Sequence, residues 1–269
     1  MKTTEELITP DMAKELIARN RNNRPISEKH VTFLADQMRR GQWMMTHQGI
    51  ALSKFNDILD GQHRLLAVIK SNCSINTLLS VGSDPATFPT MDTGKTRSAG
   101  DTFYIQGVKS YAKMASGIGS YLRSKGSNNL RARGSSREYK VSNTDILNEY
   151  KGNEEFWQDH LAWNQKYYAK LKIMTITNLF TMTAMLIKER RHPEETVKDF
   201  LDKLYTLKPS DNVTIDKLRD ILLKNTYTNK PLKPKFRTAL IIKAWNFYIS
   251  GREVKVLKLI EDEVFPVLI

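Results

Sequence analysis

The sequence predicts an α+β fold, in which an N-terminal α/β domain (residues 1–104) precedes a mostly helical domain (residues 105–269). Two observations lead to this prediction. Up to about residue 100, short apolar runs typical of strands alternate with apolar residues at helical spacing. Beyond that point nearly every apolar pattern is helical. A chain of 269 residues is long enough for one large domain or two smaller ones with buried cores.

Capping residues delimit the elements expected in the first domain. Ser27 is a typical N-cap for a helix with apolar residues at helical spacing, and Gly41 is a typical end for it. A second helix is expected through Leu65–Ile69. Short strands are expected at residues 50–52, 58–59 and 75–81.

The second domain is expected to be helical from residue 142 to about Gly251, after an amphipathic helix at residues 111–122. The apolar stretch Ile173–Ile187 is shorter than a membrane span and contains several threonines, so we expect a buried helix there. Between residues 123 and 140, Gly, Ser, Asn and Arg predominate, and a basic loop is expected.

Three finer predictions concern the last hundred residues. Pro193 is expected in the first turn of one helix, since proline is tolerated there. Thr214 is expected to cap the next helix. The weak alternation of Val254–Leu259 predicts a short edge strand.

The charge distribution points to polyanionic partners. The formal net charge is +13, and residues 61–140 alone carry twelve Lys and Arg against four Asp and Glu. Such a cluster favours nucleic acid, nucleotide phosphates or both, although an inert basic surface has the same composition. Cys73 is the single cysteine, which excludes an internal disulfide and predicts a reducing, cytoplasmic location. No membrane partner is expected, because no apolar run reaches roughly 18 residues.

The string Asp60-Gly61-Gln62-His63-Arg64, called the DGQHR turn below, has the features of an anion site. A strand leads to a glycine, and the helix that follows presents amide N–H groups and the positive end of its dipole. Arg64 adds a fork-shaped cation, and His63 can donate to phosphate or accept a proton. Asp60 can orient Arg64, hold a metal ion or act as a base. In the alternative, purely structural role, Asp60 caps the helix and Arg64 pairs with a surface carboxylate.

Residues 23–81 resemble the ParB/sulfiredoxin superfamily, in particular its DGQHR-type members from phages and mobile elements. Residues 91–97 and 243–246 also resemble motifs of longer, phage-associated ParB-like proteins. The resemblance implies a ParB/sulfiredoxin-like fold for the first domain. The matching segments are Arg24–Ser27, Met38–Trp43 and Asp60–Ala67.

Three branches of this superfamily imply three chemistries. Sulfiredoxins carry a cysteine in the turn and reduce a sulfinic acid with ATP, but Gln62 stands at that position here, so the nucleophile is missing. Chromosome-partitioning ParB proteins bind CTP at an Arg-rich turn and clamp DNA, whereas this sequence shows no clear helix-turn-helix and no obvious dimerising C-terminal domain. Free-serine kinases of the same fold carry Asp-Gly-His-His-Arg, close to the DGQHR turn, and transfer phosphate to a hydroxyl.

The resemblance therefore implies a nucleotide-dependent, DNA-associated protein of a phage or mobile element that binds ATP or CTP and can hydrolyse it. Mg²⁺ is expected, because a metal ion bridging phosphate oxygens offsets the charge that builds up in transfer. The catalytic candidates are Asp60, His63 and Asp92, the metal candidates are Asp60 and Asp92, and the phosphate-binding candidates are Arg24, Gly61, Gln62, His63, Arg64, Lys95 and Arg97.

Some of these contacts are expected from outside the turn. Arg24 lies just before the helix expected after Ser27, and proteins of the resembling superfamily often place ligand contacts there. Gly94–Thr96 resembles the end of a P-loop, but Pro89 stands where that loop requires glycine, so a P-loop is not expected. Residues 90–97 have two interpretations. In one they form an ordinary polar turn; in the other, Asp92, Lys95 and Arg97 lie beside the DGQHR turn, where Lys95 and Arg97 neutralise phosphate and Asp92 binds a metal ion or acts as a base.

The basic loop is the expected contact with DNA. Its cations can follow a nucleic-acid backbone, and Tyr139 can stack on a base, although a solvated loop without a partner fits the same composition. A homodimer formed through the helical part is also compatible with the sequence. The expected DNA-binding residues are Arg123, Lys125, Arg131, Arg133, Arg137 and Lys140.

Two other functions fit the same residues. A kinase would move phosphate to a hydroxyl of a small molecule or of a modified DNA base. A non-enzymatic DNA-binding protein would keep the fold without turnover. A nuclease has little support, because the sequence shows no acidic cluster suited to two metal ions. If the chain is an enzyme, it is expected to be an NTPase or a phosphotransferase.

Overall fold

The computed structural model describes residues 1–21, 23, 25–84, 86, 97–126, 130, 141–226, 228, 232–259 and 263–269. The chain divides into two compact units, Met1–Thr96 and Arg97–Ile269, and each has its own cluster of buried apolar side chains. Helix α4 (Ala99–Ile105) packs against α5 (Tyr111–Gly126) in the second unit. The expected division after residue 104 therefore falls inside a helix.

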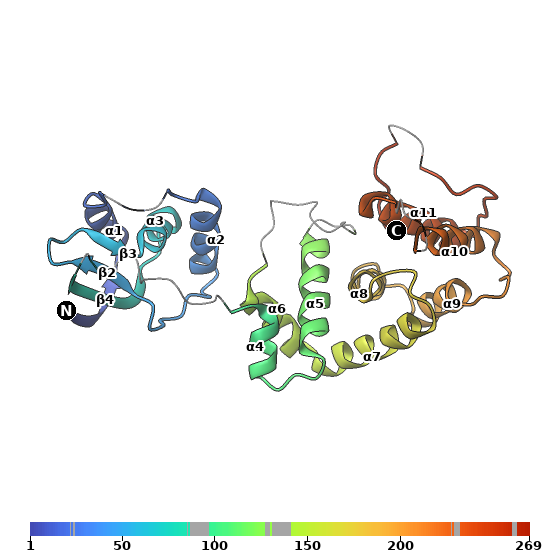
Figure 1. Ribbon diagram of the computed structural model, residues 1–269, viewed down its shortest axis with the longest axis horizontal. Helices are drawn as coiled ribbons and strands as arrows, with labels where there is room; N and C mark the ends of the chain where they lie inside the picture. The colour runs from blue at the N-terminus through green and yellow to red at the C-terminus, as the bar shows by residue number, and fades with distance from the viewer. Residues whose placement is uncertain are drawn as a thin grey trace. The chain divides into compact units, whose positions relative to one another are not determined.

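A four-stranded sheet lies in the first unit (Figure 1). Its strands are β1 (Lys2–Ile8), β2 (Ile50–Ser53), β3 (Ile58–Asp60) and β4 (Ile75–Ser83). Their order is β1-β4-β2-β3, with β4 parallel to β2 and the other two pairs antiparallel. A sheet in one unit and helices in both confirm the coarse prediction of an α+β chain.

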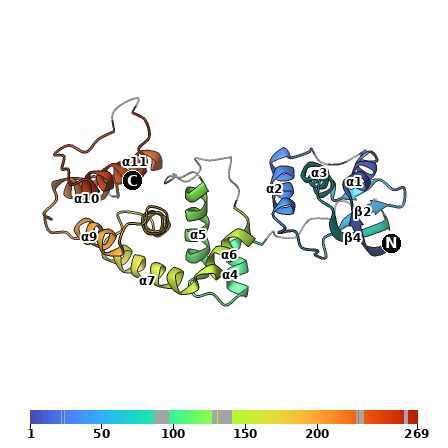
Figure 2. The same ribbon diagram turned by 180° about the vertical axis from the view of Figure 1, so that it is seen from behind.

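Three helices accompany the sheet: α1 (Pro10–Ile17), α2 (Glu28–Arg39) and α3 (Gln62–Ser71). Helix α3 lies between α1 and α2 and packs against both (Figures 1 and 2). Gly41 ends the α2 segment in the left-handed conformation, as predicted. The elements expected between Ser27 and Val81 are confirmed, whereas β1 and α1 were not predicted.

The regular elements described in the second unit are helical. The long helix α7 (Glu154–Lys170) and the short helix α8 (Ile176–Ala184) pack together, and α8 also packs against α5, so the predicted buried helix is confirmed. Trp157 and Trp245 are fully buried in this core. The remaining elements are α6 (Asn143–Gly152), the π-helical turn η2 (Met185–Glu189), α9 (Glu194–Leu204), α10 (Val213–Thr226) and α11 (Pro234–Ile249).

Two predictions about helix ends in this unit are wrong. Thr214 lies inside α10 and does not cap it; the side-chain oxygen of Asn212 accepts from the amide of Ile215 at 3.0 Å instead. Pro193 occupies the position just before α9 and not its first turn. Both errors are shifts of one or two residues, because several neighbouring residues at each site are compatible with a cap.

The predicted edge strand at Val254–Leu259 is also wrong, since these residues form no strand. The amide of Val254 donates to the hydroxyl of Thr214 at 2.7 Å, and Leu257 is buried in the helical core. Alternation alone does not make a strand, because a strand needs a partner with which to pair its backbone.

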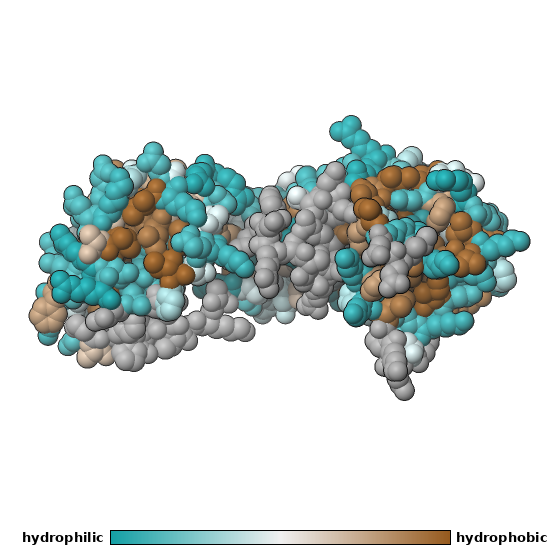
Figure 3. Space-filling model, turned by 90° about the horizontal axis from the view of Figure 1, so that it is seen from above, coloured by the Kyte–Doolittle hydropathy of each residue, from teal (hydrophilic) through white to brown (hydrophobic). Residues whose placement is uncertain are grey.

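Hydrophilic side chains surround smaller apolar patches on the face shown in Figure 3. The large hydrophobic side chains exposed on the second unit include Leu207 and Val264. None of the helices within the described ranges is both long enough and apolar enough to cross a bilayer.

Candidate functional site

The DGQHR turn joins β3 to α3 through a glycine in the left-handed region. Gly61 has φ of 100°, and α3 begins at the next residue. A Cβ atom at this position would lie 2.9 Å from Cγ1 of Ile50, so the packing as well as the backbone conformation requires glycine. The turn thus places the N-terminus of α3 directly after the end of β3.

Asp60 and Arg64 form a partly buried ion pair one helical turn apart. One carboxylate oxygen of Asp60 accepts from the amide of Gly61 at 2.6 Å, and the other accepts from Nη1 of Arg64 at 3.1 Å. The same Nη1 donates to the carbonyl of Gly49 at 2.8 Å. The side chains of Arg64 and Asp60 are 18% and 26% exposed, so the guanidinium is held in place and still reaches solvent. Asp60 therefore orients Arg64, as the functional interpretation expects, whereas the N-cap of α3 is Gly61 and not Asp60.

Gln62 and His63 face the interior of the unit and are only 3% and 6% exposed. Nδ2 of Asn20 donates to Oε1 of Gln62 at 3.1 Å, and the amide of Ser27 donates to Nε2 of His63 at 3.0 Å. Because Nε2 accepts a hydrogen bond, it carries no proton in this conformation. It can therefore donate to a phosphate only after the contact with Ser27 breaks.

The segment before α2 was expected near the DGQHR turn because of Arg24, but the contacts made by its described residues were not predicted. In addition to the contacts of Asn20 and Ser27, Nδ2 of Asn23 donates to the carbonyl of Ile58 at 3.2 Å. The signal for these contacts was the run of asparagines and arginines at residues 20–24, a composition typical of a loop that needs side-chain partners.

The other predicted site residues are dispersed or lie outside the described residues. Arg97 belongs to the second unit, where its carbonyl accepts from Asn143 at 2.9 Å. Arg123 and Lys125 lie in the last turns of α5 and not in a loop, because the helix continues to Gly126; Lys125 pairs with Glu189 at 3.2 Å. The predicted residues outside the described ranges are Arg24, Asp92, Lys95, Arg131, Arg133, Arg137 and Lys140.

Of the two predicted metal ligands, Asp60 lies within the described residues and Asp92 lies outside them. Both oxygens of Asp60 already accept hydrogen bonds, from Gly61 and Arg64. In the described part of the chain, no group of three or more His, Cys, Asp or Glu side chains is placed to hold a metal ion. Mg²⁺ in nucleotide sites is usually held by one or two carboxylates together with water and phosphate oxygens, so its presence here stays a prediction.

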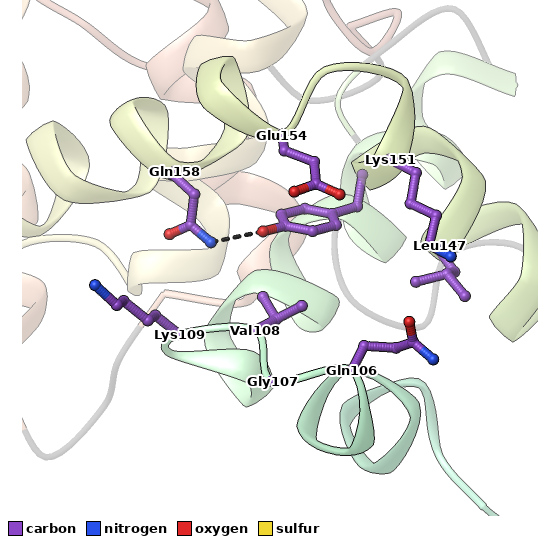
Figure 4. A pocket seen from close by; sticks show the side chains of 9 residues that line it. Gln106, Gly107, Val108, Lys109, Leu147, Lys151, Glu154 and Gln158 are labelled. Atoms are coloured by element: carbon purple, nitrogen blue, oxygen red, sulfur yellow. Dashed lines mark hydrogen bonds between the residues drawn. The ribbon is translucent and has the colours of Figure 1, made fainter.

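A pocket of about 430 Å³ in the second unit was not predicted from the sequence (Figure 4). It lies between the turn after α4 and helices α6 and α7. Tyr150 forms part of its wall, and the hydroxyl of this tyrosine accepts from Nε2 of Gln158 at 2.7 Å. Lys109 and Lys151 stand on opposite sides of the pocket. An aromatic wall with a few polar and charged groups is typical of a pocket for a small polar molecule.

The start of α3 in the first unit and the pocket beside α6 and α7 in the second can each hold a ligand. Only the first combines a helix N-terminus with a positioned guanidinium. Comparison of the chain with protein-family models, with curated proteins and with solved structures found no match.

Proposed function

We propose that this chain is a nucleotide-dependent, DNA-associated protein that binds the phosphates of ATP or CTP at the DGQHR turn, within a ParB/sulfiredoxin-like first unit. The observation that carries the proposal is the position of Arg64. Asp60 and the carbonyl of Gly49 hold its guanidinium beside the N-terminus of α3. The helix dipole, the first-turn amides and a permanent cation all attract phosphate.

The ion pair does not prevent this role. A guanidinium has five N–H donors, and the contacts with Asp60 and Gly49 both use Nη1. Arg64 can therefore hold a phosphate oxygen through its other nitrogens while Asp60 keeps it in position. In this scheme Asp60 is a positioning residue, and Gly61 allows the phosphate to approach the backbone closely.

We expect Arg64→Ala to weaken nucleotide binding by about ten- to a hundredfold, since a hydrogen bond to a charged group is worth roughly 1.5–3 kcal/mol. The measurement is equilibrium binding of ATP and of CTP with magnesium, followed by γ-phosphate labelling to trace where the phosphate goes. Arg19→Ala is the matched control, because Arg19 is an exposed arginine of the same unit. Equal affinity for nucleotide in both variants would sink the proposal.

The fate of the labelled phosphate separates the enzyme classes. Label released as free phosphate indicates an NTPase, whereas label on an acceptor indicates a kinase. If no nucleotide binds and DNA binding is salt-sensitive and unchanged in Arg64→Ala, the chain is a DNA-binding protein in which the DGQHR turn has a structural role.

Asp60→Asn tests whether the carboxylate does more than position Arg64. Asparagine keeps an oxygen that can accept from Gly61, but it removes the charge that attracts Arg64. We expect nucleotide binding to fall by no more than about tenfold, since one partly exposed ion pair contributes roughly 1 kcal/mol. Turnover that disappears while binding persists would assign Asp60 to the chemistry; turnover that follows binding would restrict it to positioning.

A further inference from the structure

A second cavity of the second unit, about 290 Å³ in volume, is lined by two cationic side chains, Lys172 and Arg237. It lies where three segments meet: the connection from α7 to α8, the C-terminal end of α10 and the first turns of α11. Ile173 and Met174 give it a buried apolar base. Its polar lining consists of Tyr168, Lys172, Thr175, Asn225, Thr226 and Arg237, and none of the described residues that line it is acidic.

One nitrogen of Arg237, Nε, is buried at this cavity without a hydrogen-bond partner among the described residues. A buried N–H of a charged group without an acceptor is costly, and a bound anion would remove that cost. The other cation of the lining, Lys172, is exposed at the mouth.

The surrounding helices add to the positive charge. Helix α8 is capped by Thr175 and has no acidic residue in its first turn. Helix α11 also has no acidic residue there, and it begins among Lys233, Lys235 and Arg237. Cations at a helix N-terminus oppose the dipole, so this arrangement is unfavourable without an anion. The C-terminal end of α10 offsets only about half an elementary charge.

We infer that this cavity binds one phosphate group, and that the group belongs to a nucleic-acid backbone. A phosphate oxygen would accept from Nε of Arg237, and Lys172 would neutralise the charge. Thr175 and the amides that begin α8 would provide further donors. The choice of nucleic acid as the source of the phosphate rests on the proposed DNA association; the phosphate site itself does not, and it is independent of the DGQHR turn.

The test compares the double variant Lys172→Gln/Arg237→Gln with the control Lys217→Gln/Arg252→Gln, which removes the same charge at exposed positions of the same unit. In the first arm, thermal unfolding is measured in inorganic phosphate and in chloride at equal ionic strength. In the second arm, binding of a fluorescein-labelled 20-nucleotide DNA, single-stranded and duplex, is measured by anisotropy across a salt series. Neither arm requires nucleotide or Arg64.

We expect phosphate to raise the melting temperature of the wild type and of the control, and this stabilisation to be lost in the double variant. In the DNA arm, the slope of log affinity against log salt should fall by about one relative to the control. Loss of the phosphate effect with unchanged DNA binding would overturn the nucleic-acid source and leave a site for a free phosphate compound. If the double variant behaves like the control in both arms, the phosphate site is overturned. If the double variant does not fold, the single variant Lys172→Gln, at an exposed position, replaces it in both measurements.

Discussion

Replacing Gly61 with alanine is expected to destabilise the first unit by about 3 kcal/mol and to weaken nucleotide binding with it. Two effects add at this position. A non-glycine residue at φ of 100° stores roughly 1 kcal/mol or more of backbone strain. The new Cβ atom would also lie 2.9 Å from Ile50, a residue that is 1% exposed at the centre of the sheet, and overpacking a core costs about 1–3 kcal/mol.

The matched control is Gly41→Ala. Gly41 also has a positive φ, 64°, but a Cβ atom there would meet nothing within 4 Å. This variant should therefore lose only the strain, about 1 kcal/mol. Hydrogen exchange measured in peptides from residues 1–84 reports the opening free energy of this unit separately from that of the helical unit. Equal losses in the two variants would show that the contact with Ile50 relaxes without cost, and that the turn is less constrained than the structure indicates.

The sequence allowed prediction of those elements whose apolar residues repeat with a clear period. Helix α2 has Ser27 at its N-cap position, although the side chain makes no capping hydrogen bond, and it stops at Gly41; both signals are local. Strand β1 was missed because most of its residues are polar and exposed, and it is held by backbone pairing with β4. Such pairing depends on a partner more than sixty residues away, which no local pattern reports.

In the candidate site, too, features set by local sequence could be predicted and contacts between distant segments could not. The glycine and the helix start at the DGQHR turn follow from residue types, and both are present. The inward direction of Gln62 and His63 could also have been predicted from helical spacing. Gln62 lies three residues before Leu65 and His63 lies four before Ala67, and both of these apolar residues are fully buried. The contacts of Arg64 with Gly49 and of Asn20 with Gln62 could not be predicted, since they depend on how separate segments meet in space.

The helical unit is expected to lose about 3 kcal/mol of stability at His160 as the pH falls from 6.5 to 4. His160 is buried among aromatic rings, and its Nε2 contacts the carbonyl of Phe180 at 3.1 Å and the hydroxyl of Thr183 at 3.0 Å. Its Nδ1 is buried without a hydrogen-bond partner among the described residues, so a proton added there would have no acceptor. Burial lowers the pKa of His160 to about 4, and the carbonyl of Phe180 opposes this effect only in part.

The direction of the pH dependence follows from proton uptake. With an ordinary pKa near 6.5, the unfolded chain binds a proton at His160 in a range where the folded protein does not. The stabilisation is therefore complete above pH 6.5, falls as the pH decreases, and is lost near pH 4, at about 1.4 kcal/mol per pH unit. The acidic residues titrate in part of the same range, so the informative quantity is the difference between the wild type and His160→Gln.

Glutamine at this position stays neutral at every pH and can still donate to the carbonyl of Phe180. The free energy of unfolding of His160→Gln, measured by denaturant titration from pH 7 to pH 4, should therefore fall less than that of the wild type. The difference between the two falls should be about 3 kcal/mol over the whole range. His192→Gln is the control, because it makes the same replacement at a half-buried histidine of the same unit, next to Ile269. Parallel curves for the wild type and His160→Gln would mean that the buried imidazole accepts its proton at an ordinary pH, which requires the helical core to open around it.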